Sequence, residues 1–253
     1  MNVRGHAAIV TGGGSGLGAE TARHLARAGA KVTAIDLSAE AARKVAAEFG
    51  GIGIGADVGD AKGLEQAFAQ ARAAHGAARI AVCCAGIAPA ARIVGKEGPM
   101  KLDDFERVIR VNLLGTFNTM RLAAAEMGAL PALEDGERGL IVMTASVAAF
   151  EGQIGQAAYA ASKGGVVGLM LPAAREFARS GIRVLTIAPG LIGTPMLLGM
   201  PQNVQDSLAA SVPFPARFGR PDEYARLVMH MAENVMLNGA VVRLDGAIRM
   251  QPK

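Results

Sequence analysis

The feature that most constrains the fold of this chain is a short apolar run followed at once by a glycine-rich turn and a helical pattern. Residues 7–11 form the apolar run, and residues 19–28 repeat apolar side chains at helical spacing. A helix N-terminus after such a turn presents free N–H groups and a positive dipole end to a pyrophosphate. A plain turn with Ser15 as a helix cap is the alternative. With both flanking elements clear, the sequence predicts a nucleotide-binding turn that includes Gly12, Ser15, Gly16, Leu17 and Gly18.

Apolar runs and helical patterns alternate along the rest of the chain. This alternation predicts βαβ crossovers, and hence a parallel sheet covered by helices on both faces. We expect one Rossmann-type, doubly wound α/β domain of about seven strands over residues 1–253. The sixth strand is expected at residues 182–187, and a long helix at residues 102–127.

Three further segments are expected to be irregular. Residues 87–100 contain Gly, Pro and basic residues without periodicity, which predicts a loop over the site. Residues 191–219 are rich in Leu, Met, Pro and Phe and are expected to form a lid with an apolar inner face. The tail at residues 246–253 is too short to be a domain, and we expect it to pack on a neighbour.

Small and acidic residues follow the predicted strands at the edge where ligands of such folds bind. Asp36 is expected to accept hydrogen bonds from ribose hydroxyls and to repel a 2′-phosphate, which favours NAD over NADP; the alternative is that Asp36 caps the helix after it. Asp57 and Val58 are expected at the adenine. A further group of small residues follows the predicted strand at residues 80–83. Their side chains would let a cofactor lie close, and they are Cys84, Ala85 and Gly86.

The candidate chemistry lies between residues 144 and 166. Ser146 follows a predicted strand, and Tyr159 and Lys163 lie one turn apart on a predicted helix. A phenol has a pKa near ~10, and lowering it to about 7 requires roughly 4 kcal/mol of phenolate stabilisation, which a nearby ammonium can supply. The alternative, a core tyrosine beside a solvated lysine, is disfavoured because the strand-end residues converge on the same edge.

Composition argues against several classes of protein. The net charge of +4 comes from scattered basic residues, which disfavours nucleic-acid binding. The adjacent Cys83 and Cys84 are expected to be free thiols of a reducing compartment. No signal, transit or membrane-spanning segment is expected, so we predict a cytoplasmic protein. The histidines lack ligand spacing, and no metal site is predicted.

These residues together resemble the short-chain dehydrogenase/reductase family over the full length of the chain. The resemblance implies that Tyr159 is the general acid/base and Lys163 its pKa-lowering, ribose-binding partner. It also implies that Ser146 holds the substrate oxygen and that Asn112 keeps a proton-relay water; from its residue type alone, Asn112 is equally a buried polar bridge. The remaining residues that the resemblance assigns to the cofactor are Pro189, Ile192 and Thr194.

Four segments of the chain carry a closer resemblance, at residues 146–159, 187–197, 212–221 and 243–252. They resemble the branch of that family that oxidises 3-hydroxyacyl-CoA thioesters to 3-oxoacyl-CoA. The resemblance implies an NAD-dependent homotetramer of fatty acid metabolism, and Cys83 departs from it because the family usually has Asn there. Gln153 and Gln156, between the serine and the catalytic helix, are our candidates for substrate contact. The alternatives are a reductase of carrier-bound 3-oxoacyl chains or other carbonyls, a hydroxysteroid dehydrogenase and, in another class, a non-catalytic cofactor-binding scaffold.

Overall fold

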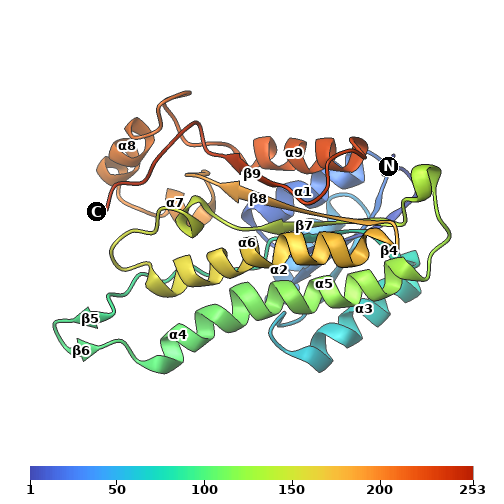
Figure 1. The fold of residues 1–253 in the computed structure, drawn as a ribbon, viewed down its shortest axis with the longest axis horizontal. Helices are drawn as coiled ribbons and strands as arrows, with labels where there is room; N and C mark the ends of the chain where they lie inside the picture. The colour runs from blue at the N-terminus through green and yellow to red at the C-terminus, as the bar shows by residue number, and fades with distance from the viewer. Residues whose placement is uncertain (253) are drawn as a thin grey trace.

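The core of the molecule is a seven-stranded sheet in which every neighbouring pair of strands is parallel (Figure 1). The computed structural model describes residues 1–252, apart from the side chain of Met196. The order of strands is β3-β2-β1-β4-β7-β8-β9. Their bounds are β1 Ala7–Thr11, β2 Lys31–Asp36, β3 Ile52–Gly55, β4 Ala78–Cys83, β7 Gly139–Thr144, β8 Ile182–Pro189 and β9 Val241–Leu244. The predicted fold class and strand number are confirmed.

Helices cover both faces of the sheet because the central strands are apolar on both sides. One face packs against α3 (Ala61–His75), α5 (Gly115–Gly128) and α6 (Ala157–Ala178). The other packs against α1 (Gly16–Arg27) and α9 (Pro221–Glu233), which lie together above the sheet in Figure 1. A further helix, α2 (Ala39–Ala47), packs beside β2 and β3.

One expectation about the connecting segments is wrong. Residues 87–100 are not all loop, because β5 (Val94–Gly95) and β6 (Gly98–Pro99) form a small antiparallel hairpin. The expected helix at residues 102–127 is present, but it contains an irregular turn. It comprises α4 (Leu102–Ile109), a π-helical turn at Arg110–Leu114 and then α5. Such π-bulges commonly mark functional sites, and this one contains Asn112.

The last part of the chain crosses the carboxyl end of the sheet. The segment predicted to be a lid holds two short helices, α7 (Pro195–Leu198) and α8 (Gln202–Ala210). The tail up to Pro252 packs on its own chain, with Pro252 O accepting from Ile154 N at 3.0 Å. Lys253, the final residue of the predicted tail, lies outside the described residues. No helix in residues 1–252 is long and apolar enough to cross a membrane.

Candidate active site

A cavity of about 680 Å³ opens at the carboxyl ends of the strands. The order of strands reverses between β1 and β4, which is where doubly wound sheets bind ligands. Nearly all the predicted site residues line this cavity. They are Gly12, Ser15, Gly16, Leu17, Gly18, Asp36, Asp57, Val58, Cys84, Ala85, Gly86, Ser146, Gln156, Tyr159, Lys163, Pro189, Ile192 and Thr194. Of the predicted site residues, only Asn112 and Gln153 are not part of its wall.

The glycine turn is held by close backbone approaches. Gly12 has φ of 66°, and a Cβ atom there would lie 2.7 Å from Ala85 N. A Cβ on Gly18 would overlap the carbonyl of Gly12. Ser15 stands at the N-cap position of α1, yet its side chain makes no capping hydrogen bond to the described chain. The hydroxyl of Ser15 and the first N–H groups of α1 are therefore free to face a ligand in the cavity.

Asp36 ends β2 and is fixed by two backbone N–H groups. Its carboxylate accepts from Gly14 N and from Ser38 N, each at 3.0 Å. The cap of α2 is Ser38, whose hydroxyl accepts from Ala41 N at 3.2 Å. The alternative that Asp36 caps this helix is therefore wrong, and the carboxylate is held at the cavity wall.

The cavity wall also contains two arginines that the sequence did not suggest. Arg110 donates to Asp57 across 2.9 Å, and Arg107, one turn earlier, also lines the cavity. Asp57 additionally accepts from Gly59 N at 2.8 Å. Val58 packs where Gly115 leaves room, since a Cβ on Gly115 would overlap the Val58 side chain. The helical spacing of Arg107 and Arg110 before Asn112 was the available signal for them.

Ser146, Tyr159 and Lys163 come together at the other end of the cavity. Ser146 follows β7, and its hydroxyl accepts from Ala148 N at 3.1 Å, at the start of a short 3-10 turn. Tyr159 and Lys163 lie one turn apart on α6, with Lys163 Nζ 5.7 Å from the centre of the Tyr159 ring. Nζ also donates to Thr144 O, at the end of β7, across 2.8 Å.

Burial dominates the electrostatics of this end. It lowers the pKa of Lys163 to about 8, because removal from water disfavours the charged ammonium. Burial also raises the pKa of Tyr159, while a hydrogen bond with Ser146 opposes that rise. The lowered phenol pKa expected from the sequence is therefore not found in the protein alone. Desolvation of the phenolate outweighs the hydrogen bond with Ser146.

Asn112 lies behind the cavity, fully buried in the π-helical turn. Its side-chain oxygen accepts from Ile87 N at 2.8 Å, and its amide donates to Ile87 O at 2.9 Å and to Ser162 Oγ at 3.0 Å. Thr116 Oγ1 donates to the backbone oxygen of Asn112 across 2.7 Å. The residue is thus a buried polar bridge that ties residue 87 to α6, and its role in holding a water stays a prediction.

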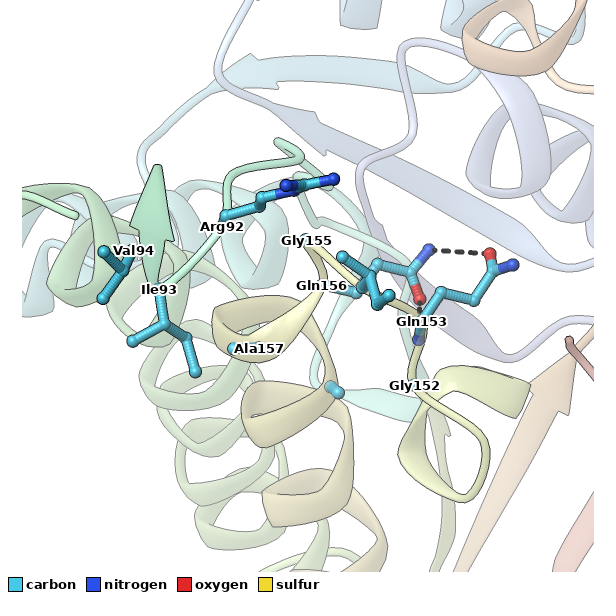
Figure 2. A pocket seen from close by; sticks show the side chains of 10 residues that line it. Arg92, Ile93, Val94, Gly152, Gln153, Gly155, Gln156 and Ala157 are labelled. Carbon is cyan, nitrogen blue, oxygen red and sulfur yellow. Dashed lines mark hydrogen bonds between the residues drawn. The ribbon is translucent and has the colours of Figure 1, made fainter. Parts of the chain in front are cut away.

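Both candidate substrate residues line a recess beside the cavity, but only Gln156 also lines the cavity itself. Gln156 lines the main cavity, whereas Gln153 lines only a neighbouring recess of about 560 Å³ between residues 92–94 and residues 152–160. Figure 2 shows the two amides side by side in this recess, with Gln156 Nε2 donating to Gln153 Oε1 at 3.4 Å. Gln153 Nε2 donates to Gln251 O at 2.9 Å. Gln153 is therefore engaged with the C-terminal tail.

A buried polar cluster lies behind Cys84. Thr144 Oγ1 and the Tyr224 hydroxyl are 2.7 Å apart, and the Cys84 thiol is 3.6 Å from each of them. Cys83 and Cys84 are both free. Burial raises the pKa of the Cys84 thiol, so it is a poor nucleophile at neutral pH. Within residues 1–252, no group of three or more His, Cys, Asp or Glu side chains is arranged to hold a metal ion.

Known proteins share both the sequence and this architecture. Residues 6–204 match the family described as short chain dehydrogenase. The human 3-hydroxyacyl-CoA dehydrogenase type-2 is 52% identical over 99% of this chain and 98% of its own, and the Drosophila melanogaster protein of that name is 49% identical over 99% and 100%. The mouse (3R)-3-hydroxyacyl-CoA dehydrogenase is 36% identical over 99% and 98%.

A solved structure is similar over its entire length. The crystal structure of 3-hydroxyacyl-CoA dehydrogenase type-2 from Mycobacterium avium superimposes with a TM-score of 0.91 and 41% identity, and the match covers 100% of both chains. The cavity, its glycine turn and the Ser146, Tyr159 and Lys163 cluster thus occur in a chain that matches dehydrogenases from end to end. This chain belongs to the short chain dehydrogenase family.

Proposed function

We propose that this protein oxidises 3-hydroxyacyl-CoA thioesters to 3-oxoacyl-CoA, with NAD as the hydride acceptor. The observation that carries the proposal is a single cavity with a glycine cradle at one end and Ser146, Tyr159 and Lys163 at the other. The names of relatives at about half identity over the whole chain support the choice of substrate. Such a reaction belongs to fatty acid metabolism.

The residues at the cradle fit a dinucleotide. Gly12 and Gly18 leave no room for side chains, so the backbone there can approach a pyrophosphate closely. Members of this family use a nicotinamide cofactor, and the carboxylate of Asp36 supports NAD rather than NADP. No arginine or lysine occupies positions 37 and 38, next to Asp36, where a 2′-phosphate would require a cation. Ile192 and Thr194 line the same wall and would contact the nicotinamide end.

The chemistry requires a base for the substrate hydroxyl. Tyr159 takes that proton as the hydroxyl becomes a carbonyl, and Ser146 holds the same oxygen by a hydrogen bond. When bound, the nicotinamide supplies the acceptor for the hydride that leaves the substrate carbon. The Lys163 ammonium stabilises the Tyr159 phenolate, because opposite charges attract strongly in a buried site. Thr144 O accepts from Lys163 Nζ and so holds the ammonium at the end of β7.

The test is turnover of 3-hydroxybutyryl-CoA, supplied as each enantiomer in turn, followed by NADH absorbance. Wild-type enzyme is expected to reduce NAD with at least one enantiomer. Tyr159→Phe removes only the hydroxyl and is expected to lower kcat by about 10²–10⁴-fold, the usual contribution of a general acid/base. NADH binding, measured by fluorescence, should persist in this variant. Steroid oxidation without turnover of any acyl-CoA would overturn the substrate assignment.

The preference for NAD is tested separately at Asp36. Wild-type enzyme should turn over faster with NAD than with NADP. Asp36→Ala removes the acceptor for the ribose and the repulsion toward a 2′-phosphate, so the ratio of kcat/KM for NAD over NADP should fall by about tenfold or more. A wild-type preference for NADP would contradict this part of the proposal and favour the reductase of carrier-bound chains.

We further propose one domain over residues 1–253 with a lid at residues 191–219, assembled as a homotetramer in the cytoplasm. Exposed apolar residues on and beside α5, Leu114 and Phe117, support association, since large apolar patches tend to mark interfaces. The free thiols of Cys83 and Cys84 support a reducing compartment. Light scattering after gel filtration tests the assembly, and cell fractionation tests the location. A monomer, or a protein recovered in another compartment, would contradict the corresponding part.

A further inference from the structure

The end of the chain contributes to the cavity in a way that no sequence motif indicates. Met250 lines the cavity together with Leu191 and Leu197, although it lies some fifty residues after them in the chain. Its backbone N–H donates to Glu151 Oε2 at 3.2 Å. This contact ties Met250 to the spacer between Ser146 and the catalytic helix.

A cluster of four charged side chains holds this segment in place. Arg243, at β9, contacts both oxygens of Glu151 through two nitrogens, at 2.7 and 3.1 Å, and also contacts Asp245 at 2.7 Å. Arg249 lies 3.3 Å from Glu151 and 3.4 Å from Asp245. The cluster is formally neutral, and the paired contacts from Arg243 to Glu151 fix an orientation as well as a distance. The guanidinium of Arg243 also lies 5.4 Å from the centre of the Phe150 ring.

Backbone contacts extend the same segment in two directions. Toward the catalytic helix, Gln251 O accepts from Gln153 Nε2 at 2.9 Å and Pro252 O accepts from Ile154 N at 3.0 Å. Toward the predicted lid, Phe214 N donates to Gly246 O at 3.2 Å, and a Cβ on Gly246 would lie 2.5 Å from Val212. Residues 245–252 therefore connect the spacer before α6 with the lid segment.

The bend in this segment requires unusual backbone geometry. Gly246 and Ala247 have φ of 59° and 67°, in the left-handed region that disfavours alanine by roughly 1–2 kcal/mol. Ala247 N donates to Asp245 Oδ1 at 3.0 Å, and the Ile248 side chain is buried under the bend. A strained residue that is held by its surroundings returns the chain toward the cavity, which brings Met250 to its wall.

We propose that residues 245–252 form the outer wall of the substrate end of the cavity and that Met250 determines which acyl chains fit there. The proposal rests on the proposed oxidation of 3-hydroxyacyl-CoA thioesters. A methionine suits this position because its flexible thioether adapts to an apolar chain. The wall is tied to Glu151 and to the lid segment by the contacts above, so its position sets the space for the chain beyond the reacting carbon.

The experiment compares two opposite changes of volume at Met250 with a matched methionine elsewhere. Met250→Ala enlarges the cavity and should raise the ratio of kcat/KM for 3-hydroxypalmitoyl-CoA over 3-hydroxybutyryl-CoA by about tenfold, the effect of one or two methylenes in an apolar pocket. Met250→Phe narrows it and should lower the same ratio. Met236→Ala is the control, since Met236 is 90% exposed. The dissociation constant of NADH should change less than about twofold in all three.

The opposite changes expected in the kcat/KM ratio of the two Met250 variants distinguish a role of Met250 in specificity from a purely structural role. Loss of stability would move both Met250 variants in the same direction, and if Met250→Phe does not fold, Met250→Ala and Met250→Leu give a graded series. If both Met250 variants are active and their ratio of kcat/KM for the long over the short thioester equals that of Met236→Ala, the wall proposal is overturned but the proposed function is not. Absence of turnover with every thioester in the wild type would instead overturn the proposed function, and the wall proposal with it.

Discussion

The two ends of the cavity are built from different kinds of contact. At the glycine turn, backbone lies against backbone: Gly12 approaches Ala85, Gly18 approaches Gly12, and Gly13 N donates to Ile35 O at 3.0 Å. At the substrate end, side chains hold the wall, mainly through the pairing of Glu151 with Arg243 and Arg249. These three side chains are partly exposed, whereas the strands that carry the glycine turn are fully buried.

This difference indicates which parts of the cavity wall can alter their conformation. A close backbone contact leaves no room for an added side-chain atom, so the residues of the glycine turn cannot be replaced by larger ones. A wall held by partly solvated ion pairs contributes little to global stability and can open locally at small cost. Lys163, at the cavity wall, and Asn112, behind the cavity, carry buried polar groups. The predictions below compare these three regions, in order of expected effect.

The largest effect is expected from one methyl group at the cofactor end. Gly18→Ala places a Cβ against the Gly12 carbonyl and should destabilise the fold by about 3 kcal/mol, with loss of NADH binding. Gly168→Ala is the control, because a Cβ there meets nothing within 4 Å on α6. It should stabilise the helix by roughly 0.5–1 kcal/mol. Urea unfolding and NADH fluorescence measure both, and equal behaviour of the two variants would refute the backbone argument.

The second effect concerns the bridge behind the cavity. Asn112→Ala leaves the partly buried N–H and C=O of Ile87 and the buried Ser162 hydroxyl without their side-chain partner and should cost about 2–3 kcal/mol. Asn203, exposed on α8, is the matched control, and Asn203→Ala should change stability by less than about 0.5 kcal/mol. Thermal unfolding gives the comparison. A loss of kcat without any loss of stability would instead favour the role of Asn112 in holding a water.

The third prediction is that replacing Lys163 stabilises the folded protein within a defined pH range. Burial lowers the pKa of Lys163 from 10.5 to about 8. Below pH 8, where this lysine is protonated in both the folded and the unfolded chain, the shift lowers the free energy of unfolding by about 3 kcal/mol. Between pH 8 and pH 10.5 the unfolded chain binds more protons than the folded one, so wild-type stability rises with pH.

Replacing the buried ammonium should therefore change stability by an amount that depends on pH. Lys163→Met should be more stable than wild type by about 1–2 kcal/mol at pH 7, after allowance for the lost bond to Thr144 O, although it should be inactive. This advantage should shrink by about pH 10. Urea unfolding at both pH values measures it, with exposed Lys62→Met as the control. A wild type more stable than the variant at pH 7 would contradict the account.

The smallest global effect is expected at the substrate end. Glu151→Gln breaks the charge pairing with Arg243 but should cost less than about 1 kcal/mol, because the pair is partly exposed. Hydrogen exchange should nevertheless increase in residues 150–156 and 245–252, and about 1 M NaCl should have the same effect on the wild type. Glu65→Gln, which breaks an exposed pair with Arg121, should leave these segments unchanged. Unchanged exchange in Glu151→Gln would show that the wall does not depend on the cluster.

Much of the cofactor end was predictable because its signals are local. The glycine turn lies between a strand and a helix that are adjacent in sequence, and parallel strands bring Asp36, Asp57 and Ser146 to one edge. Tyr159 and Lys163 share a helix face because they are four residues apart. Arg110 was missed because its partner, Asp57, is 53 residues away.

The sequence by itself determined the sheet, the glycine cradle and the meeting of Ser146, Tyr159 and Lys163, since each depends on short-range periodicity or spacing. Only the tertiary structure decided that Asn112 is a buried bridge, that burial raises the pKa of Tyr159, and that Met250 returns to the cavity. Desolvation and the pairing of Glu151 with Arg243, 92 residues apart, depend on which distant segments pack together. Local patterns do not contain that information, because it arises only when the chain is compact.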